Sequence, residues 1–395
     1  MSIVKSALKS IRLLISNGVL CILRKMVSIK DEIIFISTPD YSDNALALSD
    51  YLSTSVEGKE YKCYWLVDDV NAYRKKYSGK GVSFLSKKNK LGVVPIKTVK
   101  HHLQAKFVFA THGFLIPQEQ AKPEQKYILL WHGCGFKAKT GSHYTSFDKA
   151  LVPGPLFVES KSKYWKVSPD KLLPEGYPRY DWMLHPSQEA KQFFSDLKKG
   201  YDKVIFWLPT VRNSIVDRQY PESVISQFPI LSKTEDWKNI DNWLTSVNML
   251  LIVKLHNTQK KYDIPFEEFK NIRVIENKDF MKDGVKLYEL FPFTDGLISD
   301  YSSVSFDYLI VDNPICYTLD DYKVYESTRG FVFDHPLDYM PGHHVYNVQD
   351  LKKYLEDVKN GRDEYKKRRQ DVREIAITGT TTSYCEQILK ALSVL

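Results

Sequence analysis

The sequence predicts an α/β protein built from two Rossmann-like halves, and three observations carry this prediction. Short apolar runs rich in β-branched and aromatic residues alternate with helical segments, as in doubly wound parallel sheets. The runs form two series, which the segment 176–200 separates. The length of 395 residues suits two domains of about 100–200 residues each. No short fixed repeat occurs, which excludes a solenoid.

The first series begins with the strand predicted at residues 31–38 (DEIIFIST), a continuous apolar run of the kind that is buried on both faces of a sheet. A helix is predicted at 44–52. The remaining strands of this series are expected at 61–67, 82–85, 106–110 and 127–131.

The second series begins at residues 203–208 (KVIFWL). Its other strands are expected at 249–255, 272–275, 296–298 and 314–317, with a helix at 302–311 and a C-terminal helix from about residue 348 to the end. The predicted segments are an amphipathic helix (1–30), two Rossmann-like domains (31–190 and 191–375) and a terminal helix (376–395).

Residues 1–30 have the pattern of a basic amphipathic helix. Its apolar positions recur at helical spacing: Ile3, Val4, Ala7, Leu8, Ile11, Leu14, Ile15 and Gly18. Lys5, Lys9 and Arg12 lie mostly off that stripe. Such a helix lies either in a membrane interface or on the core of its own protein. The apolar stretch 13–23 is too short to span a bilayer, so any attachment to a membrane is expected to be peripheral.

The composition excludes several classes of protein. Hydrophobic residues make up 43% and charged residues 26%, which excludes collagen, a disordered chain and a polytopic membrane protein. The net charge of +8 suits an anionic partner without selecting one, and no motif indicates nucleic-acid binding. The five cysteines are widely spaced without a C-x-x-C pair, which favours free thiols. No phosphate-loop, dinucleotide or metal-ligand motif occurs, so we expect no cofactor and no metal.

Ligands bind at the carboxyl ends of parallel strands, which directs attention to the residues after each strand. His132 follows the strand at 127–131, and Gly133 and Lys137 come soon after. An imidazole titrates near neutral pH, so His132 can act as a general base beside an anion-binding loop. The alternative is a histidine held by backbone hydrogen bonds. Lys254 and His256 share one face of an extended strand end and can together contact a phosphate, or can be solvated there.

Asp300, Ser302 and Ser303 follow the strand at 296–298 and open the predicted helix. The first N–H groups of a helix attract phosphate, and the two serine hydroxyls can add hydrogen bonds. Asp307 lies one turn further on, where it can accept hydrogen bonds from a ribose, although an ordinary helix cap also explains this pattern.

Two arginines follow other segment ends. Thr210 and Arg212 follow the strand at 203–208, and a guanidinium can bind a phosphate with two donors. Arg179 either does the same or braces the junction between the domains.

These motifs together resemble the CDP-glycerol glycerophosphotransferases of teichoic acid and capsule synthesis, over about residues 31–355. Six segments match in family order: 131–137 (WHGCGFK), 176–181 (GYPRYD), 208–212 (LPTVR), 255–257 (LHN), 294–308 (TDGLISDYSSVSFDY) and 329–334 (RGFVFD). The resemblance implies a GT-B fold with the active site between an acceptor-binding first domain and a CDP-donor-binding second domain.

The resemblance also implies the chemistry. A hydroxyl of a lipid-linked or polymeric acceptor attacks the β-phosphorus of CDP-glycerol or CDP-ribitol, and CMP leaves. His132 resembles the general base and His256 the second catalytic histidine, which stabilises charge on the pyrophosphate. Ser302 and Ser303 would hold the donor phosphates, with Arg212 nearby. The implied location is the cytoplasmic face of a bacterial membrane, at an anionic surface.

The sequence departs from the family pattern beside the expected base. Cys134, Gly135 and Phe136 replace the usual Thr or Ser, Pro and Leu; Tyr180 replaces Asn, and Asn257 replaces Pro. These substitutions are expected to affect the choice of acceptor and of donor alditol more than the fold. The alternatives are a GT-B glycosyltransferase that uses a nucleotide sugar, and a membrane-associated scaffold without catalysis.

Overall fold

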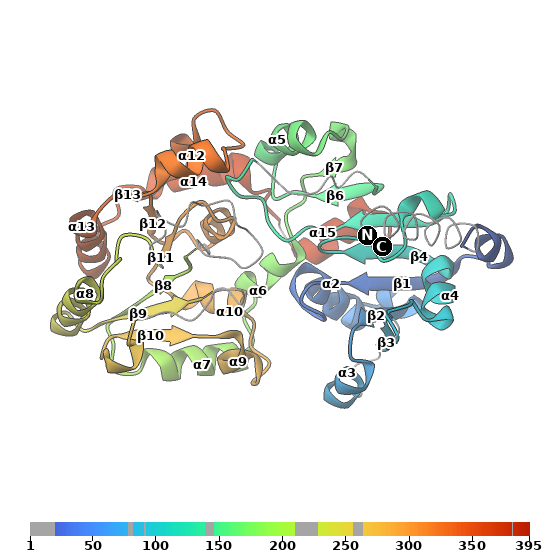
Figure 1. The fold of residues 1–395 in the computed structure, drawn as a ribbon, viewed down its shortest axis with the longest axis horizontal. Helices are drawn as coiled ribbons and strands as arrows, with labels where there is room; N and C mark the ends of the chain where they lie inside the picture. Colours follow the sequence, from blue (N-terminus) through green and yellow to red (C-terminus); the bar gives the residue numbers. More distant parts are fainter. Residues whose placement is uncertain are drawn as a thin grey trace, which may run out of the picture.

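A computed structural model describes residues 20–77, 82–90, 92–138, 146–209, 228–255, 264–380 and 382–395. These residues form two parallel β-sheets side by side, each flanked by helices (Figure 1). The predicted fold of two Rossmann-like halves is confirmed.

The first sheet has seven strands in the order β3-β2-β1-β4-β5-β6-β7. The bounds are β1 (Lys30–Ile36), β2 (Lys62–Val67), β3 (Ser83–Ser86), β4 (Ala105–Ala110), β5 (Lys126–Leu129), β6 (Lys149–Leu151) and β7 (Leu172–Leu173). Ile36 pairs with Ala110, and Ala110 pairs with Leu129, so β1, β4 and β5 end in line. Residues that follow these three strands therefore meet at one edge of the sheet.

The second sheet has six strands in the order β10-β9-β8-β11-β12-β13. The bounds are β8 (Lys203–Trp207), β9 (Met249–Lys254), β10 (Ile272–Ile275), β11 (Gly296–Ser299), β12 (Ile315–Thr318) and β13 (His343–Val345). The central strands are buried on both faces, as their continuous apolar runs predict.

The helices bury one apolar face each. In α2 (Asp43–Thr54), Ala45, Leu48 and Leu52 are buried at helical spacing. The other α-helices are α3 (Val70–Lys76), α4 (Ile96–Gln104), α5 (Leu156–Trp165), α6 (Asp181–Leu184), α7 (Gln188–Lys198), α8 (Thr234–Ser246), α9 (Asn277–Met281), α10 (Leu287–Leu290), α11 (Val304–Asp307), α12 (Tyr322–Thr328), α13 (Val348–Lys359), α14 (Lys366–Ala376) and α15 (Tyr384–Ala391).

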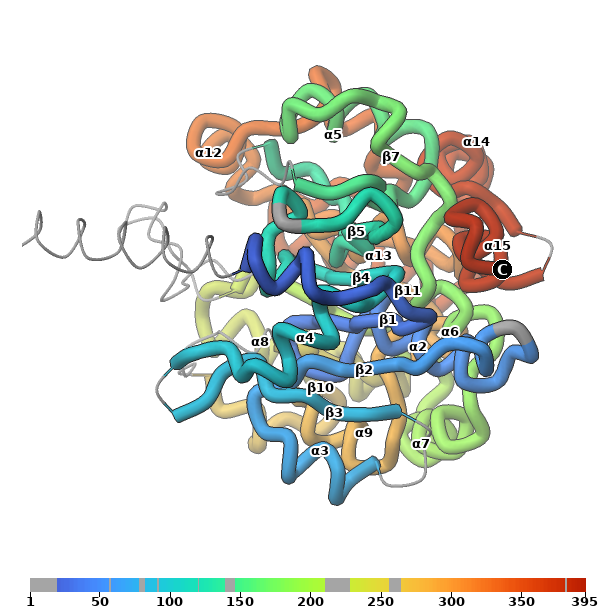
Figure 2. The backbone as a smooth tube through the Cα atoms, turned by 90° about the vertical axis from the view of Figure 1, so that its right-hand side faces the viewer, coloured from blue at the N-terminus to red at the C-terminus, as the bar shows by residue number. Residues whose placement is uncertain are grey.

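The single C-terminal helix predicted from residue 348 is wrong, because α13, α14 and α15 occupy this part of the chain. Gly361, whose φ is +67°, follows the end of α13. The last helix returns to the first half (Figure 2), where it packs against α2. Its first backbone N–H groups donate to Asp181, from Tyr384 at 2.6 Å and from Cys385 at 2.9 Å.

Other elements also differ from prediction. The helix expected at 302–311 is four residues of α-helix, α11, followed by a 3₁₀ turn, η8 (Tyr308–Ile310). The strands β6, β7 and β13 were not predicted, since two or three residues are too few for a periodic pattern.

The predicted N-terminal amphipathic stripe, from Ile3 to Gly18, lies outside the described residues. Residues 20–26 are helical, and Ile22 and Met26 on this helix are exposed. In the described part of the chain, no helix combines the length and the apolar character needed to cross a membrane.

Candidate active site between the two halves

The loop that carries His132 lies directly against the loop that follows β11 in the second half. The backbone N–H of Phe136 donates to the carbonyl of Tyr301 at 3.3 Å. Behind this contact, the Phe136 and Phe306 rings stack with their centroids 4.8 Å apart, and Phe157 meets Phe306 edge-on at 4.9 Å. An apolar interface therefore brings two of the predicted site loops together.

Gly133 and Gly135 permit this close approach. A Cβ atom at Gly133 would lie 2.3 Å from Ser303 Oγ, and the φ of Gly133 is +145°, which L side chains rarely adopt. A Cβ atom at Gly135 would lie 2.8 Å from the backbone nitrogen of Ser303. Glycine at these positions is thus required for the close contact between the loops in this structure.

His132 is held in one orientation by its neighbours. Its Nδ1 lies 3.5 Å from the carbonyl oxygen of Thr111, and its ring centroid is 4.0 Å from that of Trp131 and 4.1 Å from that of His112. Because a carbonyl oxygen only accepts, the contact with Thr111 places the proton on Nδ1 and leaves the Nε2 lone pair for a substrate. Burial, and then the neighbouring His112, lower the pKa of His132 to about 3, so the ring is neutral at neutral pH.

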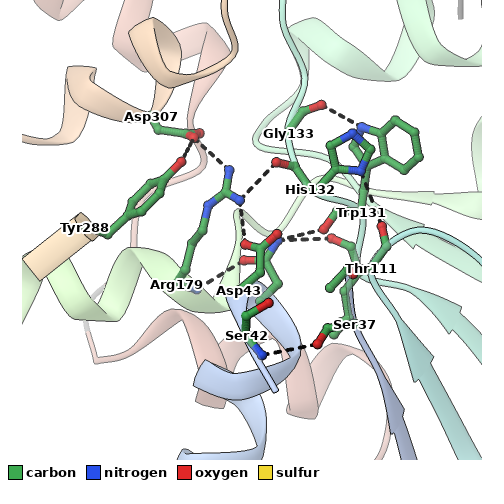
Figure 3. A network of polar contacts seen from close by, with 12 residues as sticks. Ser37, Ser42, Asp43, Thr111, Trp131, His132, Gly133, Arg179, Tyr288 and Asp307 are labelled. Atoms are coloured by element: carbon green, nitrogen blue, oxygen red, sulfur yellow. Dashed lines mark hydrogen bonds and ion pairs between the residues drawn. The ribbon is translucent and has the colours of Figure 1, made fainter. Parts of the chain in front are cut away.

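Arg179 lies at the junction of the two halves (Figure 3). Its Nη1 donates to Asp43 Oδ1 at 2.6 Å and to the carbonyl of His132 at 2.9 Å, both in the first half. Its Nη2 donates to Asp307 Oδ2 in the second half at 2.8 Å. Of the two predicted roles for Arg179, this geometry corresponds to bracing the junction.

Asp307 has a different place from the one expected for a ribose ligand. Its side chain is 1% exposed, and besides Arg179 it accepts hydrogen bonds from Tyr180 Oη at 2.5 Å and Tyr288 Oη at 2.6 Å. Since both carboxylate oxygens are already engaged between the halves, Asp307 is a structural residue in this arrangement. Tyr180, a departure from the family pattern, supplies one of these bonds.

The serine loop faces the His132 loop. Ser302 and Ser303 are half-buried, whereas Asp300 is buried and accepts a hydrogen bond from the backbone N–H of Ser302 at 3.2 Å. Because α11 has only four residues, it provides much less dipole than the predicted helix. The serine side chains and nearby N–H groups therefore remain the candidates for phosphate contact.

Two predicted lysines lie at the ends of other segments. Lys137 pairs with Phe331 in an isolated antiparallel bridge that joins the halves. Lys254 is half-buried at the end of β9, where its ammonium donates to the carbonyl of Leu255 at 3.0 Å. Burial lowers the pKa of Lys254, although Glu276 opposes the shift.

Three predicted residues lie outside the described residues: Thr210, Arg212 and His256. Four residues around His132 and Arg179 were missed by sequence reasoning: Asp43, Asn44, His112 and Tyr288. His112 follows β4 as His132 follows β5, so the rule applied to strand ends would have found it. Asn44 donates to the carbonyl of Trp131 at 2.8 Å and accepts from the N–H of Arg179 at 3.3 Å, contacts that no sequence motif signals.

Among the described residues, one group has the composition of a metal site: His343, Asp357 and Glu364, whose ligand atoms lie within 4.8 Å of one another. Arg362 Nε already donates to Asp357 Oδ1 at 2.6 Å. None of these residues belongs to the loops described above.

Known proteins resemble this chain in sequence and in fold. A family model described as CDP-Glycerol:Poly(glycerophosphate) glycerophosphotransferase matches residues 20–391. A teichoic acid glycerol-phosphate primase of Bacillus spizizenii is 26% identical over 303 residues, which cover 70% of this chain and 72% of the relative. A teichoic acid ribitol-phosphate primase of the same organism is 24% identical over 308 residues, covering 71% and 72%.

Solved structures show the same fold. The wall teichoic acid polymerase TagF superposes with a TM-score of 0.70 and 18% identity, covering 99% of this chain and 97% of that chain. A UDP-GlcNAc 2-epimerase from Methanocaldococcus jannaschii shares the fold more loosely, with a TM-score of 0.55, 13% identity and coverage of 92% and 99%. The family match extends over nearly the whole chain, and the chain therefore belongs to the CDP-Glycerol:Poly(glycerophosphate) glycerophosphotransferase family.

Proposed function

We propose that this protein transfers glycerol phosphate or ribitol phosphate from a CDP-alditol to a hydroxyl of a lipid-linked or polymeric acceptor in teichoic acid or capsule synthesis. The family match supports the reaction class. The observation that carries the proposal to this chain is the geometry of His132, a neutral imidazole beside the serine loop of the other half.

In the proposed reaction, the acceptor oxygen forms a bond to the β-phosphorus while the bond from that phosphorus to the bridging oxygen breaks. The leaving group is CMP, and the proton of the acceptor hydroxyl passes to Nε2 of His132. A pKa of about 3 makes the free ring a weak base. The negative charges of a bound pyrophosphate raise that pKa, so donor binding itself activates the base.

The acceptor is assigned to the first half and the donor to the second. Ser302 and Ser303 face the His132 loop and are proposed to bind the donor phosphates, with Lys254, Thr210 and Arg212. His256 is proposed to stabilise charge on the pyrophosphate as the β-phosphorus is attacked. Such a site acts by positioning and charge stabilisation.

Attachment to the cytoplasmic face of the membrane is proposed for access to a lipid-linked acceptor. The exposed Ile22 and Met26 with the neighbouring Arg24 and Lys25 form an apolar and basic segment, which suits an anionic lipid surface. Co-sedimentation with anionic and with neutral vesicles tests the membrane attachment separately. An equal fraction of protein in the pellet with both kinds of vesicle would contradict it.

The test of the reaction is CMP release from CDP-glycerol and from CDP-ribitol, each with a lipid-linked acceptor analogue. Relatives of both kinds match at similar identity, so both donors are offered. We expect CMP from one donor with the wild type and at least ~100-fold less with His132→Gln. No CMP from either donor, with turnover of a UDP-sugar instead, would overturn the proposal in favour of a glycosyltransferase.

A further inference from the structure

We propose that His112 is a positioning residue for His132, and that it holds the plane of the base by face-to-face stacking and takes the first proton in its place. This inference rests on the proposed role of His132 as the base. It concerns a residue outside the motifs that define the family resemblance.

The geometry of the pair is close to an ideal stack. The two ring centroids are 4.1 Å apart, and the ring planes differ by 6°. The rings follow adjacent parallel strands, β4 and β5, whose ends are in register at Ala110 and Leu129. Trp131 packs on His132 as well, with a centroid distance of 4.0 Å. The base is therefore held by aromatic neighbours that the sheet itself positions.

Thr111 orients both imidazoles. Its hydroxyl oxygen accepts the N–H of Thr38 at 3.3 Å and lies 2.9 Å from Nδ1 of His112, so the hydroxyl proton is available to donate to that nitrogen. Its carbonyl oxygen accepts from Nδ1 of His132 at 3.5 Å. In the neutral pair, His132 therefore keeps its Nε2 lone pair for the acceptor hydroxyl.

Stacked rings at this distance do not both carry a positive charge at neutral pH, because a second charge so close is strongly disfavoured. The charged groups around the pair decide which ring is protonated first. Asp43, on α2, favours the charged form of His112, and Lys87, after β3, opposes it. Arg179 and Lys161, on η4 (Pro178–Tyr180) and α5, both disfavour the charged form of His132.

Burial lowers the pKa of both rings. Asp43 opposes this shift at His112, whereas at His132 the carbonyl of Thr111 opposes it and His112, Arg179 and Lys161 add to it. On acidification, His112 therefore accepts the first proton, and its charge keeps the proton off His132. The base remains unprotonated to lower pH than it would alone.

The test compares His112→Phe, which keeps a flat ring but removes the charge, with His112→Ala, which removes the ring. The control is His101→Phe, since His101 also packs on an aromatic ring, that of Tyr64 at 4.2 Å with the ring planes tilted by 33°, and lies outside the site. The first readout is a pH titration of histidine-labelled protein by NMR, with the His132 signal assigned from His132→Gln. The second is the pH profile of kcat/KM for CMP release.

We expect His112→Phe to move the His132 titration, and with it the acidic limb of kcat/KM, to higher pH by about one unit. We expect His112→Ala to lower kcat about 10-fold as well, with little change in the donor KM, since the base is no longer held. His101→Phe should leave both curves in place.

Unchanged His132 titration in His112→Phe would overturn the inference. A loss of kcat in His112→Phe that is equal at every pH would also overturn it, because a merely structural role predicts that result. The NMR titration does not depend on turnover. If the wild type releases no CMP but the His132 titration still moves in His112→Phe, the proposed function fails while the coupling of the two histidines stands.

Discussion

The hydrogen bonds around Asp307 predict that loss of one carboxylate charge loosens the contact between the two halves. Asp307→Asn keeps the shape of the side chain but removes the negative charge that faces the buried Arg179. It also presents an amide NH₂ group where Arg179, Tyr180 and Tyr288 all donate. The variant therefore leaves a buried cation with Asp43 as its remaining acidic neighbour in the described structure.

The expected loss of stability follows from the burial of Arg179 and Asp307. Arg179 is 4% exposed and Asp307 is 1% exposed, so solvent cannot replace the lost partner. Removing one member of such a pair costs about 3–5 kcal/mol, and the isosteric amide places this variant near 3 kcal/mol. At about 2–4 °C per kcal/mol for a unit of this size, the melting temperature should fall by roughly 6–12 °C.

The assay is thermal unfolding by circular dichroism together with CMP release. Asp312→Asn is the matched control, because Asp312 accepts from the buried Arg369 at 3.2 Å wholly within the second half. Both variants should melt earlier, but only Asp307→Asn should also lose activity, since it alone disturbs the junction beside His132. A double-mutant cycle with Arg179→Met should give a coupling of about 2 kcal/mol. Additive effects, or melting of Asp307→Asn within 2 °C of wild type (about 1 kcal/mol or less), would refute this reasoning.

Three further predictions concern separate features. Gly133→Ala should lower kcat by about 100-fold, because its Cβ would meet Ser303 Oγ at 2.3 Å; Gly200→Ala, where φ is +89° and no atom lies within 4 Å, is the control for backbone strain alone. Tyr180→Phe should cost about 1.5–3 kcal/mol in urea unfolding, since it removes a 2.5 Å hydrogen bond to a carboxylate, and no change would contradict the assignment. Burial lowers the pKa of His102 to about 4, below its unfolded value of 6.5, so the unfolded chain binds the extra proton. The contribution of neutral His102 to the free energy of unfolding should therefore be fully present above pH 6.5 and fall by about 3 kcal/mol between pH 6.5 and pH 4. Urea titrations at several pH values should show this dependence, and His102→Gln should flatten it.

The sequence predicted the elements whose signal is local. Continuous apolar runs identified β1 and β9 to within about two residues, because a strand buried on both faces needs apolar side chains throughout. The strand β13 contains only His343, His344 and Val345, and so carries no such pattern. The C-terminal helices were merged because helical periodicity does not show that α15 returns to Asp181, more than 200 positions earlier in the chain.

The parts of the candidate site that could be predicted also have a local sequence signal. His132 was found because the strand-end rule needs only the preceding strand. Asp307 was assigned to a ribose because spacing shows only its neighbour one turn away, Ser303. Its actual partners come from η4 and α10, and only the packing of the two halves brings these elements together.

The measurement that tests the central claim most directly is the mass of the acceptor after reaction, determined together with the nucleotide released. The account predicts that the acceptor gains one or more whole alditol-phosphate units and that one CMP appears for each unit gained. His132→Gln should abolish both products together. An acceptor that gains a sugar without phosphate, with release of a nucleoside diphosphate, would contradict transfer at phosphorus and assign the site at His132 to glycosyl transfer.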